Sequence, residues 1–156
     1  MTVARDKPKR KGIRLPDSAY GLRNTTFSIT VCCAGKAPLL SQEKLAEEVW
    51  ATVHSGSLNG YAPLHAVALM PDHVHLLVQV RELNLVVAIS RWKSFTTKLY
   101  RDLGGQGHLW QRSFYDHGIR AGEDLHATAM YIAQNPHRAG MADRARFTWS
   151  SWGSTP

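Results

Sequence analysis

Two apolar segments in the middle of the chain, 64–70 and 73–80, are separated only by Pro71 and Asp72. Both segments have the length and composition of strands. Proline suits the first position of a tight turn, and an aspartate beside it can accept a hydrogen bond from its own backbone. The arrangement predicts a β-hairpin, so the fold must contain an antiparallel pair of strands.

Around this hairpin, hydrophobic periodicity predicts five further elements. Apolar and polar side chains alternate at the start of the chain's ordered part, which is the pattern of a strand with one buried face. Asn84 can cap the helix that follows the hairpin, and Pro136 removes an amide hydrogen that the last helix needs to continue. The five elements are a strand at 25–33, a helix from 41 to about 56, a helix at 85–103, an extended segment at 109–119 and a helix at 123–135.

The resulting order is strand, helix, strand, strand, helix, strand, helix. This is the ferredoxin-like or RRM-like order with one helix appended at the C-terminus. At 156 residues the chain has the size of one domain. We therefore expect an α+β fold, in which helices cover one face of an antiparallel sheet and a further helix, carrying catalytic residues, follows at the C-terminus.

Two histidines, His73 and His75, begin the second strand of the hairpin. Side chains two residues apart on a strand point to the same face, with Cα atoms roughly 6.5 to 7 Å apart. Leu77 and Gln79 would share this face, and the two imidazoles can converge on one cation. The alternative is a pair of hydrogen-bonded histidines in the sheet, because each imidazole needs partners wherever it is buried.

Tyr131 and Asn135 lie four residues apart in the predicted last helix, and so on one face of it. A carbonyl oxygen of Asn135 would complete a site begun by the two histidines and hold Tyr131 beside the ion. Mixed nitrogen and oxygen ligands with open positions suit Mg²⁺ or Mn²⁺ acting on a phosphate. Ionising a phenol at pH 7 costs about 4 kcal/mol, and a nearby cation would supply part of that stabilisation. The pattern predicts a metal-assisted tyrosine nucleophile; the alternative for Tyr131 is an amphipathic residue at a helix surface.

The chain carries a net charge of +7, from 19 Lys and Arg against 12 Asp and Glu, which favours a polyanionic partner such as nucleic acid. The first 17 residues are basic and almost free of apolar side chains. We expect residues 1–17 to be a flexible basic arm and residues 18–156 to form the folded domain; the alternative for the arm is a solubilising tail. The residues expected to contact DNA phosphates are Arg5, Lys7, Lys9, Arg10, Lys11, Arg14 and Arg112.

The cellular compartment is predicted from what the chain lacks. No run of 18 apolar residues is present that would cross a bilayer, and the N-terminus is charged where a signal peptide is apolar. Cys32 and Cys33 are adjacent, a spacing that does not favour a disulfide and is typical of small residues in a buried strand. We expect a cytoplasmic, nucleoid-associated protein with no membrane partner.

Four segments resemble, in order and approximate spacing, motifs of the REP-associated tyrosine transposases, which belong to the HUH single-tyrosine transposase superfamily. The resemblance extends from about residue 20 to residue 152. Many relatives carry Tyr-His-Val and Arg-Gly-Asn patterns around the first strand, where this chain has TTFSIT at 25–30. The four segments are LMPDHVHLL at 69–77, GHLWQRSF at 107–114, YIAQNPHRAG at 131–140 and WSS at 149–151.

This resemblance implies that His73 and His75 are ligands of Mg²⁺ or Mn²⁺, that Tyr131 is the nucleophile and that Asn135 occupies the place of the third ligand. It also implies cleavage of single-stranded DNA near a hairpin, through a covalent 5′-phosphotyrosine bond. The released 3′-hydroxyl can later reverse the attack, so bond energy is conserved and no ATP motif is needed. The implied partner is single-stranded or hairpin DNA, during transposition or the processing of REP elements, and relatives act as monomers or as homodimers.

Several residues admit other interpretations. Tyr115 is a rival nucleophile, since Asp116 and His117 follow it directly, and His117 would alternatively assist at the metal. Trp110 and Arg112 suit base stacking or phosphate binding, although Trp110 equally suits the core. Two other functions also remain open: a non-catalytic module that binds single-stranded nucleic acid on an RRM-like sheet, and a metal-dependent hydrolase that uses water in place of tyrosine.

Overall fold

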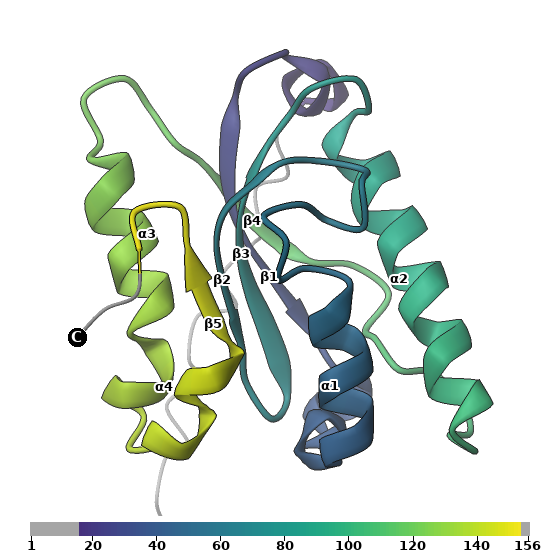
Figure 1. Ribbon diagram of the computed structural model, residues 1–156. Coiled ribbons are helices and arrows are strands. Elements are labelled where there is room, and N and C mark those ends of the chain that lie inside the picture. Colours follow the sequence, from purple (N-terminus) through teal and green to yellow (C-terminus); the bar gives the residue numbers. More distant parts are fainter. Residues whose placement is uncertain (1–15, 154–156) are drawn as a thin grey trace, which may run out of the picture.

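The computed structural model describes residues 16–153 and has an α+β fold built on a five-stranded antiparallel sheet (Figure 1). The strands are β1 (Thr26–Cys32), β2 (Leu64–Leu69), β3 (His73–Gln79), β4 (Tyr115–Gly118) and β5 (Thr148–Ser150). The α-helices are α1 (Glu43–Ala51), α2 (Leu85–Asp102), α3 (Leu125–Ala133) and α4 (Asn135–Arg138). Short 3-10 helices are η1 (Asp17–Gly21), η2 (Ala34–Lys36), η3 (Leu39–Ser41) and η4 (Ala142–Phe147).

The strand order is β4-β1-β3-β2-β5, which is the predicted ferredoxin-like order with one strand added beyond β2. The predicted hairpin is confirmed, because β2 and β3 pair antiparallel and the Met70 amide donates to the His73 carbonyl across the turn at 2.8 Å. The predicted cap is confirmed as well, since the Asn84 side chain accepts from the Val87 amide. The pattern of the sequence therefore determined the centre of the sheet correctly.

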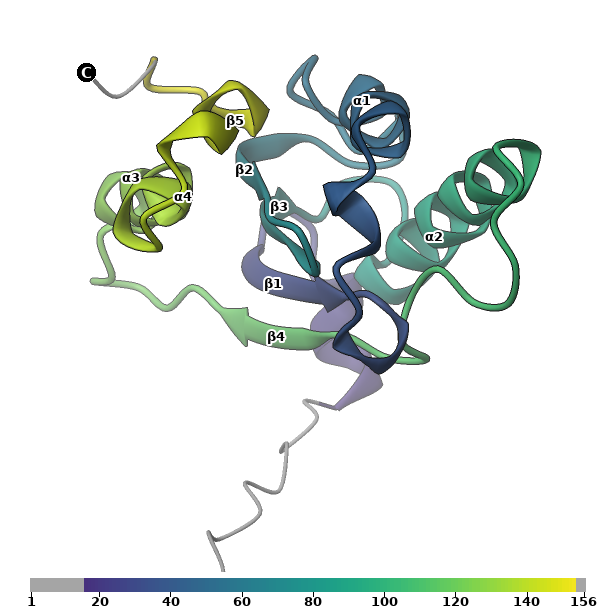
Figure 2. The ribbon, with the colours of Figure 1, turned by 90° about the horizontal axis from the view of Figure 1, so that it is seen from below.

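The main core lies between the sheet and the helices α1 and α2, which cover one face as predicted (Figure 2). Trp92 of α2 is fully buried there, and its indole nitrogen donates to the Thr52 hydroxyl at 2.7 Å. Trp110 stacks on Trp92 with ring centroids 5.2 Å apart and donates to the hydroxyl of Thr96. Trp110 is therefore a core residue, which is the second of its two predicted roles.

Helix α3 covers part of the opposite face of the sheet (Figure 2). Its buried residues Ala129 and Ile132 pack against Ala66, Ala68 and Leu77, which point away from the main core. The small alanines on β2 and α3 allow the helix to approach the sheet closely. The appended C-terminal helix thus forms a third, smaller layer on the side of the sheet that α1 and α2 leave open.

The C-terminal part of the chain differs most from the prediction. The last long helix ends at Ala133 rather than at residue 135, and Pro136 occupies the first turn of the separate helix α4. Proline has no amide to donate to a carbonyl four residues earlier, but it fits the first turn of a helix, where that amide is not needed. Strand β5 was not predicted, because a three-residue strand has too few residues to show an alternating pattern.

Among the described residues, no helix combines the length and the apolar composition needed to cross a bilayer.

Candidate active site

The paired histidines lie on the face of β3 that points away from α1 and α2. His73 and His75 alternate along the strand with the buried residues Val74 and Leu76, as their spacing predicted. Their rings are close, with centroids 4.6 Å apart and planes nearly perpendicular at 86°. The two imidazoles therefore form one unit on the sheet surface.

Each imidazole is held by a hydrogen bond at its Nδ1 atom. His73 Nδ1 donates to the Asp72 carboxylate at 2.6 Å, and His75 Nδ1 lies 2.9 Å from the Thr30 hydroxyl of the neighbouring strand. No described residue hydrogen-bonds either Nε2 atom. A carboxylate at Nδ1 is the usual arrangement for orienting a metal-binding histidine, because it leaves the lone pair of Nε2 for the ion.

The electrostatics of His75 favour the neutral form that binds metals. Burial, together with the charge interactions with His73 and Arg138, lowers the pKa of His75 to about 4, while the negative charge of Asp72 opposes this shift. An imidazole must be neutral to coordinate a cation, so His75 is ready for this role at neutral pH. The two histidines fit a divalent cation as a pair of nitrogen ligands, with the orientation already set by Asp72 and Thr30.

Tyr131 lies on α3 but faces away from the sheet. Its side chain is 64% exposed, whereas Ala129 and Ile132 of the same helix are buried against β2 and β3. The Arg138 guanidinium packs on the Tyr131 ring at 3.5 Å from its centroid and donates to the Tyr131 carbonyl at 2.6 Å. The positive charge of Arg138 also contributes to the lowered pKa of His75, so this guanidinium acts on both the tyrosine and the histidine pair.

The expectation that one helix carries both Tyr131 and Asn135 is wrong. Helix α3 ends at Ala133, the chain passes through Gln134, and Asn135 begins α4. Asn135 is half-buried at this junction. Within residues 16–153, no three His, Cys, Asp or Glu residues are placed to hold a metal ion together, so a third ligand from this part of the chain would be a group of another kind.

The rival tyrosine, Tyr115, lies on the same face of the sheet as His75. In the register of the strands, Tyr115 of β4 and His75 of β3 both stand opposite Thr30 of β1. With neighbouring strands about 4.8 Å apart, the two Cα atoms are separated by about 10 Å. Tyr115 is 63% exposed, and His117 bonds to the Glu123 carboxylate at 3.1 Å.

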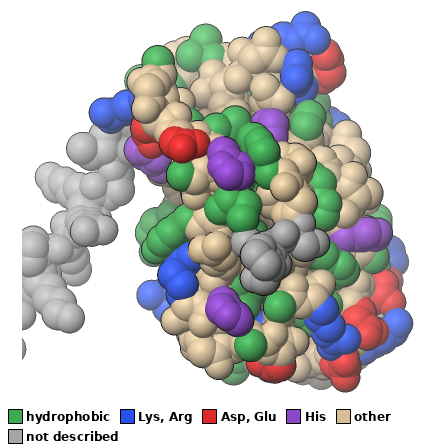
Figure 3. Space-filling model, turned by 60° about the vertical axis from the view of Figure 1, so that its left-hand side comes forward, with side chains coloured by type: hydrophobic (Ala, Val, Ile, Leu, Met, Phe, Trp, Pro, Cys, Tyr) green, Lys and Arg blue, Asp and Glu red, His purple; other side chains and the backbone are tan. Residues whose placement is uncertain are grey.

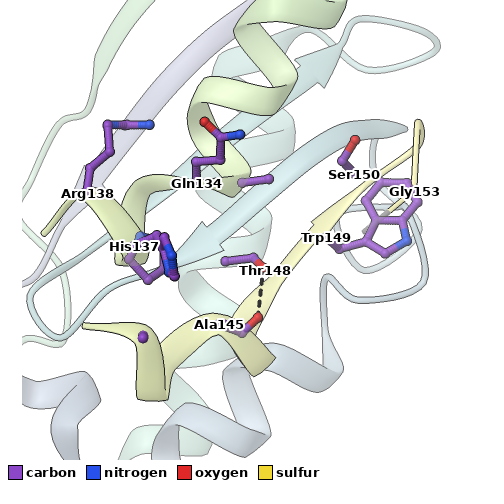
Figure 4. Close-up of a pocket in the computed structure, with 11 residues that line it drawn as sticks. Gln134, His137, Arg138, Ala145, Thr148, Trp149, Ser150 and Gly153 are labelled. Carbon is purple, nitrogen blue, oxygen red and sulfur yellow. Dashed lines mark hydrogen bonds between the residues drawn. The ribbon is translucent and has the colours of Figure 1, made fainter. Parts of the chain in front are cut away.

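A pocket lies between the α3–α4 segment and β5 (Figure 4). Gln134 and Arg138 line it from the α3–α4 segment, and Thr148 and Ser150 line it from β5. On the face of the molecule that Figure 3 shows, histidine and apolar side chains are interspersed, with acidic and basic side chains also present.

The predicted DNA-contacting residues are placed only in part. Arg112 is exposed, and it lies beside Lys93 and Arg101 of α2. The basic residues of the predicted arm lie outside the described residues: Arg5, Lys7, Lys9, Arg10, Lys11 and Arg14.

Three residues of the site were missed by sequence reasoning. Asp72 was assigned only to the turn, although its position directly before His73 could have suggested a partner. Thr30 could be found only through the register of β1 and β3, and Arg138 only through the fold of the α3–α4 segment. Residues distant in sequence become partners only once the strand order is known.

The chain matches the family model described as "Transposase IS200 like" over residues 22–135. It is 34% identical over 94 residues to a REP-associated tyrosine transposase of Haemophilus influenzae, a match that covers 50% of this chain and 51% of that protein. The chain thus spans about half the length of this curated relative.

Two solved structures share the fold to different degrees. A REP-associated tyrosine transposase bound to a REP hairpin superposes with a TM-score of 0.59 at 21% identity, covering 78% of this chain and 72% of that one. A protein described as a transposase from Deinococcus radiodurans has a TM-score of 0.49 at 14% identity, covering 77% and 92%. The first likeness supports the same sheet topology.

Proposed function

The chain belongs to the IS200-like transposase family, and from this premise we propose that it cuts and rejoins single-stranded DNA beside hairpins, with Tyr131 as the nucleophile. The observation that carries the proposal is the pair of imidazoles on β3. Both Nε2 atoms are free of described partners, and the rings lie on the face of the sheet that α3 also covers. The hairpin partner is proposed because one structural relative is bound to a REP hairpin.

In the proposed reaction, the Tyr131 hydroxyl loses its proton and its oxygen attacks the scissile phosphorus. A bond forms between this oxygen and the phosphorus, while the bond to the 3′ oxygen breaks. The departing oxygen takes up a proton and leaves as a 3′-hydroxyl, so the 5′ end is held as a phosphotyrosine. The reverse attack by a 3′-hydroxyl rejoins the strand and restores Tyr131, so one phosphoester bond is exchanged for another.

The residues that would hold Mg²⁺ or Mn²⁺ are His73 and His75, with the amide oxygen of Asn135 as the third ligand. Such an ion, when bound, polarises the phosphate and neutralises charge that develops on it. The nitrogen pair fits this role, since Asp72 and Thr30 fix both rings. Asn135 supplies an oxygen donor of the class that Mg²⁺ and Mn²⁺ accept, from the junction between α3 and α4.

Arg138 is proposed to link the two halves of the site. Its guanidinium covers the Tyr131 ring and its positive charge acts on His75, so it would attract a phosphate that approaches these two residues. Guanidinium groups bind phosphates with paired hydrogen bonds. When Arg138 turns to the phosphate it leaves the Tyr131 ring, and the phenol is then free to rotate toward the histidines.

The test is the formation of a covalent adduct between the protein and single-stranded DNA that contains a hairpin, in the presence of Mn²⁺. We expect an adduct that survives denaturation, its complete loss in Tyr131→Phe and its retention in the matched variant Tyr115→Phe. Because both tyrosines are more than 60% exposed, neither change should affect folding.

Two outcomes would contradict the proposal. An adduct that disappears in Tyr115→Phe and persists in Tyr131→Phe would identify the other tyrosine as the nucleophile. Strand cleavage with no adduct in the unmodified protein would indicate a hydrolase that uses water.

A further inference from the structure

A second cluster of polar side chains lies on the other side of the sheet, between α2 and the segment that leads into β4. We name this cavity the basic pocket. It is lined by the cationic side chains Lys93, Arg101 and Arg112, together with His108 and the hydroxyl groups of Ser94 and Thr97. Helix α2 lies across the sheet from α3 and α4 (Figure 2), so the basic pocket is separate from the pocket that Gln134 and Arg138 line.

The cations of the basic pocket have no counter-charge. Lys93, Arg101 and Arg112 form no ion pair with any residue in 16–153, and neither Asp nor Glu is among the residues that line the pocket. Lys93 is half-buried, and its ammonium donates to the carbonyls of Gln111 and Arg112 at 2.5 and 3.2 Å. A partly desolvated cation gains from an anion placed beside it, because burial disfavours the unpaired charge.

The basic pocket is connected to the histidine pair by a short series of contacts. Lys93 bonds to the Gln111 carbonyl, the Gln111 amide donates to the Cys32 carbonyl at 2.8 Å, and Cys32 stands opposite His73 in the sheet. With strands about 4.8 Å apart, Gln111 lies about 10 Å from His73. The basic pocket is therefore reached from the histidines by passing around one edge of the sheet.

The spacing of the cations fits a polymer better than a single small anion. Lys93, Thr97 and Arg101 follow one another at intervals of four residues and share one side of α2. Eight residues of helix place Lys93 and Arg101 about 12 Å apart along the axis. This separation is larger than one phosphate group, so Lys93 and Arg101 would contact different phosphates of one strand.

We propose that the basic pocket binds backbone phosphates of the DNA strand that passes through the active site, a few nucleotides from the scissile bond. This inference rests on the proposed function, because the strand has to enter at the histidine pair. The pocket would hold the strand without reading its sequence, since contacts to phosphate oxygens carry no direct information on base identity. The predicted DNA contact of Arg112 is thereby given a location and two partners, Lys93 and Arg101.

The test is the salt dependence of DNA binding, measured by fluorescence anisotropy with a DNA hairpin that carries single-stranded flanks. The protein carries Tyr131→Phe throughout, so that only reversible binding is recorded. Each lost phosphate contact should reduce the slope of log affinity against log salt by about 0.7 to 0.9. We expect the double variant Arg101→Gln, Arg112→Gln to reduce the slope by about 1.4 to 1.8, since two contacts are removed.

Arg91→Gln is the matched control. Arg91 is an exposed arginine of the same helix, also without an ion pair in the described chain, but it does not line the basic pocket. Its substitution removes the same charge as Arg101→Gln and should leave the slope unchanged. An unchanged slope in the double variant, or an equal reduction in Arg91→Gln, would overturn the proposal.

Two further measurements separate this inference from its alternatives. Inorganic phosphate at constant ionic strength should not raise the melting temperature of the protein. The contrary result is a rise that the double variant loses, while that variant keeps the salt slope of DNA binding unchanged. This result would assign the pocket to a small anion and overturn the proposal. Adduct formation with Tyr131 intact is recorded separately. A reduced slope without any adduct would support the pocket and reject the proposed function, whereas an adduct with an unchanged slope would reject the pocket alone.

Discussion

The two halves of the candidate active site are built differently. The histidine half stands on β3, in the middle of the sheet, and each ring is tied by a hydrogen bond to Asp72 or Thr30. The tyrosine half stands on α3 and α4 at the surface, where Tyr131 is 64% exposed and its ring is covered by the side chain of Arg138.

This difference suggests a division of roles between the two halves. Ligands of a metal ion must keep a fixed geometry, and a central strand with neighbours on both sides provides it. A nucleophile that attacks and later releases a DNA strand has to move between positions, and a helix end held by exposed contacts permits such movement. The following predictions test whether a substitution in one half changes adduct formation and Mn²⁺ affinity separately.

A substitution that displaces α3 should have the largest effect on adduct formation. Ala129 is fully buried against Ala66 and Ala68, so Ala129→Leu has no room without displacing the helix. We expect a loss of about 1 to 3 kcal/mol in the free energy of unfolding, measured in urea. Adduct formation should fall by about 100-fold, because a displacement of 1 Å can misplace a reacting group that much.

The comparison predicts that Mn²⁺ affinity, measured by calorimetry, falls much less than adduct formation in Ala129→Leu, because the two histidines on β3 stay in place and only the proposed ligand Asn135 moves with the helix. Ala127→Leu is the matched control, because Ala127 is exposed on the same helix and its enlargement should alter neither quantity. A parallel loss of Mn²⁺ affinity and adduct formation in Ala129→Leu would show that the two halves are not separate.

Removing the charged partner of His73 should have an intermediate effect, which is on Mn²⁺ affinity. Asp72→Asn keeps the shape of the side chain and removes the charge that faces His73 Nδ1. Partners of this kind typically contribute about 10- to 100-fold in metal affinity, and we expect a loss of that size for Mn²⁺. Asp143→Asn, at an exposed position on η4, is the control. An unchanged affinity in Asp72→Asn would indicate that the histidines do not bind the ion.

Removing Arg138 should have the smallest effect. It should lower adduct formation at the tyrosine half and raise Mn²⁺ affinity at the histidine half. In Arg138→Ala the phosphate loses its proposed contact, so adduct formation should fall by about tenfold. Mn²⁺ affinity should rise by about two- to threefold, because a positive charge that acts on His75 is removed. Arg138→Lys keeps the charge and should leave the Mn²⁺ affinity unchanged. A fall in Mn²⁺ affinity in Arg138→Ala would place Arg138 among the supports of the metal ligands.

The sequence by itself determined the elements whose pattern is local. The hairpin of β2 and β3, the Asn84 cap of α2 and the shared face of His73 and His75 all follow from spacings of a few residues, and the structure contains each of them. The order of β4, β1, β3 and β2 followed as well, because the succession of elements matched a known arrangement, whereas β5 was not predicted. These features depend on backbone geometry and on alternation, which a single segment reveals.

The tertiary structure alone decided how distant segments meet. Thr30 became the partner of His75 through the pairing of β1 with β3, and Arg138 came to cover Tyr131 because Pro136 interrupts the helix after Ala133. Lys93, Arg101 and Arg112 converge because the segment before β4 packs along α2. None of these contacts leaves a periodic signal, since each depends on the relative placement of elements that are separated along the chain and held together by the burial of the shared core.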